Sequence, residues 1–101
     1  MARKIIWADE AVSDLDAVAE YIARDSTSYA ASFITEVLDA AKSLKELSER
    51  GRVVSELGLP DIRELFIGEH RMIYLIEKSR IVILGLVHGR RDLKKLWRGK
   101  R

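Results

Sequence analysis

Residues 61–97, DIRELFIGEHRMIYLIEKSRIVILGLVHGRRDLKKLW, contain three apolar runs of strand length that are rich in β-branched residues. Two short breaks, Gly68-Glu69 and Lys78-Ser79, separate the runs. Successive runs of this kind, joined by tight turns, are typical of neighbouring antiparallel strands. The stretch therefore predicts a three-stranded antiparallel meander, and we expect the rest of the chain to pack around it.

The first half of the chain predicts one strand and a pair of helices. Residues 3–7 form a short strand candidate, and apolar residues then recur at helical spacing over residues 9–24, with Asp9 as the expected N-cap. A second helix is expected over residues 29–48, after a turn cluster of capping residues at 25–28. Because the connection is short, the two helices should form an antiparallel hairpin.

The remaining segments complete the expected fold. Residues 51–56 should be irregular or briefly extended, residues 58–61 should form a turn, and residues 91–97 should form a short terminal helix with Leu93, Leu96 and Trp97 facing inward. The predicted class is α+β with the order β-α-α-β-β-β. It is a small antiparallel sheet with a helical hairpin on one face and a short C-terminal helix. At 101 residues, we expect one domain spanning residues 1–101.

The composition excludes several classes of protein. The chain has no cysteine, so it offers no disulfide framework and no thiolate metal site. Two histidines 18 residues apart are a weak basis for a metal site, and no glycine-rich phosphate loop is present, so we expect no cofactor. The longest apolar run, residues 81–87, is too short to cross a bilayer, and the first residues do not resemble a signal peptide. We therefore expect a soluble cytoplasmic protein with no membrane contact.

Charge is distributed unevenly along the chain. The formal net charge is +2 overall, but it is −4 over residues 1–48, 0 over residues 49–87 and +6 over residues 88–101. A basic end on a balanced domain suggests contact with phosphates or with an acidic protein surface. The alternative interpretation is a solvated basic tail.

Cationic side chains gather at the ends of the predicted strands. Acid–base cleavage of RNA needs a base, an acid and cations that stabilise the developing phosphorane charge. His88 or Glu56 are candidates for the acid–base groups, and Arg63, Arg71 and Arg91 are candidates for the cations. A structural interpretation stays open, in which Arg71 forms an ion pair with Glu64 or Glu56 and His88 bonds to the backbone.

Strand alternation decides only part of this question. It places Arg71 on one face of the middle strand with Ile73 and Leu75, and it places His88 on a face of the last strand with Leu86, Leu84 and Val82. It does not tell whether the two faces coincide.

Taken together, these segments resemble toxins of the RelE/ParE superfamily from bacterial toxin–antitoxin pairs, over nearly the whole chain. The resemblance is carried by the strand that ends at Trp7, by residues 11–15 and 21–23, by Tyr29-Ala30 and Phe33, by Gly51-Arg52, and by residues 62–65, 68–74 and 87–93. It implies a small sheet with a helical hairpin on one face. It also implies a cognate antitoxin whose C-terminal segment wraps the toxin and covers its active surface.

Two activities are found within the superfamily. RelE-like members resemble ribosome-dependent endoribonucleases that cut mRNA, and in that case Arg71 and Arg91 match their phosphate-binding arginines while Glu56 and His88 match an acid–base pair. ParE-like members resemble poisons of DNA gyrase. This chain is similar to them in Arg63-x-Leu65, in the turn at residues 68–70 and in His88-x-Arg90-x-Asp92-Leu93.

The resemblance favours the ParE-like interpretation, a gyrase inhibitor without chemistry of its own. This chain departs from the nuclease pattern in having Glu64 and Phe66 around a lone Arg63, and in having Trp97 where another branch has tyrosine. The expected target-binding residues are Arg63, His88, Arg90, Arg91, Lys94, Lys95 and Trp97. The alternative is an mRNA endoribonuclease that binds the ribosome, so whether the chain is an enzyme stays open at this point.

Overall fold

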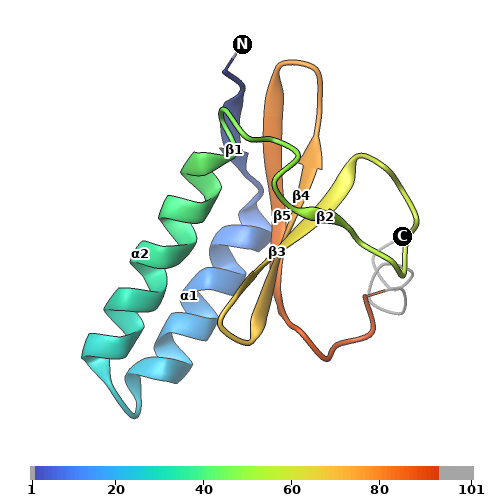
Figure 1. Ribbon diagram of the computed structural model, residues 1–101. Coiled ribbons are helices and arrows are strands. Elements are labelled where there is room, and N and C mark those ends of the chain that lie inside the picture. Colours follow the sequence, from blue (N-terminus) through green and yellow to red (C-terminus); the bar gives the residue numbers. More distant parts are fainter. Residues whose placement is uncertain (1, 94–101) are drawn as a thin grey trace.

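The three apolar runs form the antiparallel meander that the sequence predicts. The computed structural model describes residues 2–93, and Figure 1 shows how its elements are arranged. Within that range the strands are β1 (Lys4–Trp7), β2 (Arg52–Val53), β3 (Ile62–Ile67), β4 (His70–Ile76) and β5 (Arg80–His88), and the helices are α1 (Asp9–Ala23) and α2 (Thr27–Ser43). This is the predicted α+β class, and the order of elements is as predicted except for the added two-residue strand β2, which lies where a briefly extended segment was one of the expectations.

The sheet has the strand order β1-β5-β4-β3-β2 and is mixed. β3, β4 and β5 pair antiparallel, as does β2 with β3, whereas β1 pairs parallel to β5 along Lys4–Trp7. The prediction of a wholly antiparallel sheet is therefore wrong at one edge. A parallel pair needs a long crossover connection, and the intervening helices and strands supply it.

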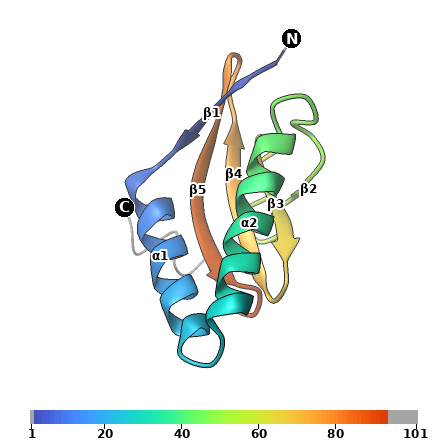
Figure 2. The same cartoon turned by 90° about the vertical axis from the view of Figure 1, so that its left-hand side faces the viewer.

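Both helices cover one face of the sheet, which Figure 2 shows from the side of the helices. Apolar residues of the helices pack there against the strands, and the buried members of this cluster are Ala11, Phe33, Val37, Ala41, Leu44, Ile67, Met72, Tyr74, Ile81, Ile83 and Leu86. Burial of this face is the main source of stability for the hairpin, because helices of this length are marginal alone.

A second, smaller cluster lies on the opposite face of the sheet. It contains Val54, Ile62, Ile73 and Leu93, all at most 6% exposed. The loop that precedes β3 and the segment that follows β5 thus pack together over β3 and β4. This face, rather than the helical face, holds the charged network described below.

The helix ends differ slightly from the prediction. Asp9 lies in the first turn of α1 rather than at its N-cap, which is Ala8, whereas Ser26 caps α2 by accepting a hydrogen bond from the backbone N–H of Tyr29 at 3.0 Å. α2 ends at Ser43, not near Ser48. The buried hydroxyl of Tyr74 donates to the backbone carbonyl of Ser48 at 2.8 Å, so residue 48 belongs to a turn against the sheet.

A β-bulge in β5 decides which side chains share a face. The register passes from Ile73↔Gly85 to Tyr74↔Ile83, so Leu84 has no partner. The extra residue reverses the alternation beyond it. Leu84 therefore packs on the opposite face from Leu86, and the prediction that His88 shares a face with Leu84 and Val82 is wrong.

The predicted terminal helix at 91–97 lies mostly outside the described residues. Its first apolar position, Leu93, is buried as expected. Between residues 2 and 93, no helix has both the length and the apolar character that a bilayer crossing requires.

Candidate functional site

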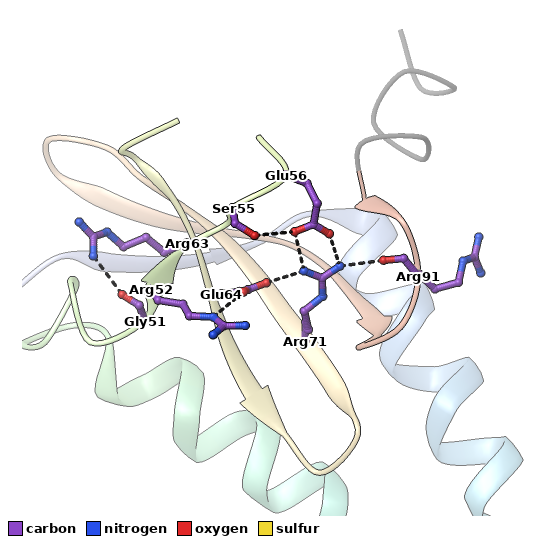
Figure 3. A network of polar contacts seen from close by, with 8 residues as sticks. All are labelled: Gly51, Arg52, Ser55, Glu56, Arg63, Glu64, Arg71 and Arg91. Atoms are coloured by element: carbon purple, nitrogen blue, oxygen red, sulfur yellow. Dashed lines mark hydrogen bonds and ion pairs between the residues drawn. The ribbon is translucent and has the colours of Figure 1, made fainter. Parts of the chain in front are cut away.

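Arg71 is the centre of a buried polar network on the face opposite the helices, shown in Figure 3. Its side chain is 4% exposed. Nη1 donates to Glu64 Oε1 at 2.8 Å and to Glu56 Oε1 at 3.1 Å, and Nη2 donates to Glu56 Oε2 at 2.8 Å and to the backbone carbonyl of Arg91 at 2.9 Å. All four N–H groups on the two terminal nitrogens are thus in use, and Glu56 is held in a bidentate pair.

The register of β3 and β4 places Glu64 beside Arg71. Arg71 lies opposite Phe66, and Glu64 is two residues further along the same face of β3. The Glu64 carboxylate is 1% exposed, and its Oε2 accepts a hydrogen bond from Nε of the exposed Arg52 at 2.7 Å. Both oxygens of this buried carboxylate are therefore bonded to guanidinium groups, which offsets the cost of removing the carboxylate from water.

These contacts change the pKa values of the pair. The pKa of Glu56 is lowered to about 2, mainly by the hydrogen bonds from Arg71 and to a smaller extent by the backbone of Leu93, while burial opposes the shift. The hydrogen bonds to Glu56 likewise raise the pKa of Arg71, although burial opposes this. Both groups are therefore charged at any pH at which the protein works.

We expect the stability contributed by Glu56 to be lost in acid. Its folded pKa of about 2 lies below its ordinary value of 4.5, so its contribution is fully present above pH 4.5 and is lost as the pH falls toward 2. Urea unfolding of the unmodified chain and of Glu56→Gln at a series of pH values measures this. The free energy of unfolding of Glu56→Gln should fall less steeply between pH 4.5 and 2, and parallel pH profiles would contradict the assignment.

The segment that follows β5 is fixed to this network and to the sheet. The backbone N–H of Gly89 donates to the carbonyl of Glu69 at 2.7 Å, and that of Arg91 donates to the carbonyl of His88 at 3.0 Å. Leu93 is 6% exposed in the smaller apolar cluster. Figure 3 shows that the carbonyl of Arg91 faces Arg71 while its side chain points away from it. Arg90 and Arg91 are both exposed.

His88 lies on the other face of the sheet, over the helices. It pairs directly with His70 across β4 and β5, and the two rings are in edge contact with centroids 5.5 Å apart. His70 in turn contacts Phe33 of α2 at 5.6 Å. Burial lowers the pKa of His70 below its ordinary value, and the nearby charge of His88 lowers it further. Nδ1 of His88 accepts a hydrogen bond from the backbone N–H of Arg90 at 3.2 Å.

The histidines border a groove of about 500 Å³ between the helical hairpin and the sheet. Its walls include Tyr21 and Tyr29, which are 70% and 61% exposed, and Phe33 at its base. Aromatic side chains exposed beside a groove are typical of a surface that a protein partner covers.

Arg63 lies apart from Arg71. Its Nη1 donates to the backbone carbonyl of Gly51 at 3.0 Å, next to the hydrogen bond between the backbone N–H of Gly51 and the hydroxyl of Tyr74 at 2.8 Å. Adjacent residues on a strand point to opposite faces, so Arg63 and Glu64 are separated by the sheet. The Nε atoms of both Arg63 and Arg71 are buried without a hydrogen-bond partner.

The structure therefore brings together only part of each set proposed from the sequence. Glu56, Arg71 and the backbone of Arg91 meet on one face, whereas His88 and Arg63 are on the other. The open question of whether the Arg71 and His88 faces coincide is answered, because the directly opposed pairs are Arg71↔Val87 and His70↔His88. The ion pairs named as the structural interpretation of Arg71 are both present. Lys94, Lys95 and Trp97 lie outside the described residues.

The sequence did not predict the parts that three residues play in this network. Glu64 was named only as a partner for Arg71, not as a buried carboxylate, and the parts played by Arg52 and Leu93 in the network were not expected. One sequence signal was available for Glu64, a charged residue in the middle of the apolar strand at residues 62–67. Among residues 2–93, no three histidine or acidic side chains lie close enough together to hold a metal ion.

Comparison with known proteins gives a family match over nearly all of the described range. Residues 5–93 match the model of the ParE toxin of the type II toxin–antitoxin system parDE. The chain belongs to the ParE toxin family. No curated protein sequence is similar enough to count as a match.

A solved structure shares the ParE-like fold. A chain of the chromosomal ParDE toxin–antitoxin system from P. aeruginosa superposes with a TM-score of 0.70, and the match covers 86% of this chain and 96% of that chain. The sequence identity is 19%, so this likeness shows the fold alone. The family match favours the ParE-like over the RelE-like interpretation and makes this protein a toxin of the type II class.

Proposed function

We propose that this ParE toxin stops growth by binding DNA gyrase in the cytoplasm and that a cognate antitoxin neutralises it. The proposed contact surface is the basic segment that begins at the end of β5, with the exposed Arg90 and Arg91 as its first cations. Family membership supports the class of target, and the geometry supports binding rather than catalysis.

The observation that carries this proposal is the state of Arg71. A nuclease that used it would need its guanidinium free to meet the scissile phosphate, together with an acid–base group on the same face. Here two carboxylates and a backbone carbonyl occupy its terminal nitrogens, and His88 is on the opposite face. Both carboxylates would also repel a phosphate brought to this position.

The exposed arginines suit recognition of a macromolecule. Arginine is enriched among residues that dominate the binding energy of protein interfaces, because its planar guanidinium forms several hydrogen bonds at once. Arg90 and Arg91 are adjacent, exposed and held at their backbone by contacts to His88 and Arg71. Side chains presented from a fixed backbone lose less conformational entropy on binding.

The antitoxin is proposed to cover the aromatic groove between the helical hairpin and the sheet. Tyr21 and Tyr29 leave an apolar surface exposed there, and the unpaired outer edge of β3 beyond β2 leaves Phe66 51% exposed. An antitoxin that covers these surfaces would raise the solubility of the toxin.

Replacing both exposed arginines tests the proposed contact. Arg90→Ala/Arg91→Ala should raise the concentration that half-inhibits gyrase supercoiling by about 30- to 700-fold, because interface arginines of this kind contribute about 1–2 kcal/mol each. The control, Lys45→Ala/Lys78→Ala, removes the same charge from exposed positions on other elements and should leave inhibition unchanged. Undiminished inhibition by the arginine variant would count against this surface.

Pulse labelling after induction of the toxin alone tests the target class. If the proposal is right, thymidine incorporation falls first while methionine incorporation continues. The opposite order would point to the ribosome and overturn the gyrase assignment.

A further inference from the structure

We propose that Arg71 is a positioning residue, which fixes the backbone carbonyl of Arg91 and thereby holds the start of the basic segment in one orientation. This inference rests on the proposed function, in which that segment meets the target. It gives a role in binding to a buried arginine that the proposed function does not use for catalysis.

The first step is that stability alone does not explain the network. A buried ion pair is weak evidence for stability, because the cost of removing two charges from water can exceed their attraction. The surroundings of Arg71 and Glu64 are apolar, with Val54, Ile62 and Ile73 in the cluster on the same face. Apolar residues of similar volume at both positions would pack there without any charge to bury.

The second step is the use of the donors of Arg71. Its Nε is buried without a hydrogen-bond partner, while its Nη2 donates to the carbonyl of Arg91 at 2.9 Å. An arginine present only to neutralise Glu56 and Glu64 has no need of that third acceptor. The contact joins residues 20 positions apart in the sequence and ties the network directly to the backbone at Arg91.

The third step is that the contact is built to be rigid. Glu56 and Glu64 fix the plane of the guanidinium from two different elements, the loop after β2 and strand β3. The backbone of Leu93 adds a further contact to Glu56, and the Leu93 side chain is buried nearby. A planar, bidentately held guanidinium has little freedom to rotate, so the carbonyl that it binds is held in a defined place.

The consequence is a fixed direction for Arg90 and Arg91. The backbone of these two residues is held at both ends, because His88 accepts from the N–H of Arg90 and Arg71 donates to the carbonyl of Arg91. Without Arg71 the apolar contact of Leu93 would still attach the segment to the sheet, but the carbonyl of Arg91 would lose the side chain that orients it. We therefore expect joint removal of Arg71 and Glu64, which leaves no unpaired charge between them, to weaken target binding more than it weakens folding.

The test uses the full chain carrying Arg71→Met/Glu64→Met, which removes both buried charges together. Hydrogen exchange followed by mass spectrometry should show the backbone amides of residues 89–93 exchanging about 10-fold faster or more, with α2 unchanged. Growth inhibition by the expressed variant should be lost although its thermal unfolding stays cooperative. The control Arg52→Gln removes the exposed partner of Glu64, leaves the contact of Arg71 with Arg91 in place, and should change neither readout.

Two results would overturn the inference: unchanged exchange of residues 89–93 in the variant, or faster exchange with full growth inhibition. If the double variant does not fold, Arg71→Lys replaces it, since lysine keeps a positive charge beside Glu64 but has no planar fork to hold Glu56 and the carbonyl together. The same two results then decide. A gyrase supercoiling assay with the unmodified chain separates this inference from the proposed function. If the unmodified chain does not inhibit gyrase, the proposed target is wrong, but hydrogen exchange and growth inhibition still decide the role of Arg71.

Discussion

Replacing Arg71 alone with methionine will lower the free energy of unfolding by about 3–5 kcal/mol at neutral pH. The expected loss is large because Glu64 is 1% exposed and would lose its buried ion-pair partner at 2.8 Å. Glu56 is less affected, since 26% of its side chain is exposed and it can turn toward water. A domain of this size is stable by about 5–15 kcal/mol, so the variant would be close to unfolding.

Urea unfolding of a double-mutant cycle measures this effect. The second change, Glu64→Met in the Arg71→Met background, should restore most of the lost stability, because it removes the uncompensated charge and fills the space with apolar atoms. Arg52→Gln is the matched control, since it removes the exposed arginine that bonds the same carboxylate. Additive effects of the two methionine changes would contradict the view that Arg71 and Glu64 act as a pair.

Replacing Tyr74 with phenylalanine will lower the free energy of unfolding by about 2–4 kcal/mol. The Tyr74 side chain is fully buried, and its hydroxyl accepts from the backbone N–H of Gly51 and donates to the backbone carbonyl of Ser48, both at 2.8 Å. Removal of the oxygen leaves one donor and one acceptor unpaired, each at a cost of about 1–3 kcal/mol. The turn that connects α2 to β2 should loosen first.

Thermal and urea unfolding of Tyr74→Phe measure the loss. Tyr21→Phe is the matched control, because the same oxygen is removed from a side chain that is 70% exposed, and it should be neutral within about 0.5 kcal/mol. Equal stability of the two variants would show that the Tyr74 hydroxyl contributes nothing beyond its packing. A side chain at Gly51 would disturb the same contact, because a Cβ there would lie 2.6 Å from the Tyr74 hydroxyl oxygen.

Local pattern was enough to predict most of the fold. The strands at residues 62–67, 70–76 and 80–88 follow from apolar runs and turn residues, and the two helices follow from apolar spacing. These signals lie within a few residues of the elements that they specify, so no knowledge of distant contacts is needed. The ends of the elements were less accurate. Residues 44–48 leave the helix because Tyr74, 26 positions after Ser48, binds the carbonyl of Ser48.

The site was predictable only in its residue types. Arg71 with Glu56 or Glu64 was a pair suggested by charge, but the sequence alone left open a free catalytic arginine. The bulge at Leu84 shows why the faces could not be assigned. One extra residue in β5 reverses every side chain beyond it, and a bulge depends on how β5 meets β4 and on Asp14 of α1, which accepts from the backbone N–H of Leu86 at 3.0 Å.

By itself, the sequence determined the α+β class, the order of the main elements and the basic C-terminal end, because composition and short-range periodicity carry these. Its motifs, in their order and spacing, carried the resemblance to a toxin superfamily. Only the tertiary structure decided that β1 is parallel to β5, that His88 and Arg71 are on opposite faces, and that Arg71 binds Glu56, Glu64 and the carbonyl of Arg91. The physical reason is that strand pairing and burial bring together groups that are distant in the chain. The charge of an arginine is free or neutralised according to those neighbours, not according to its place in the sequence.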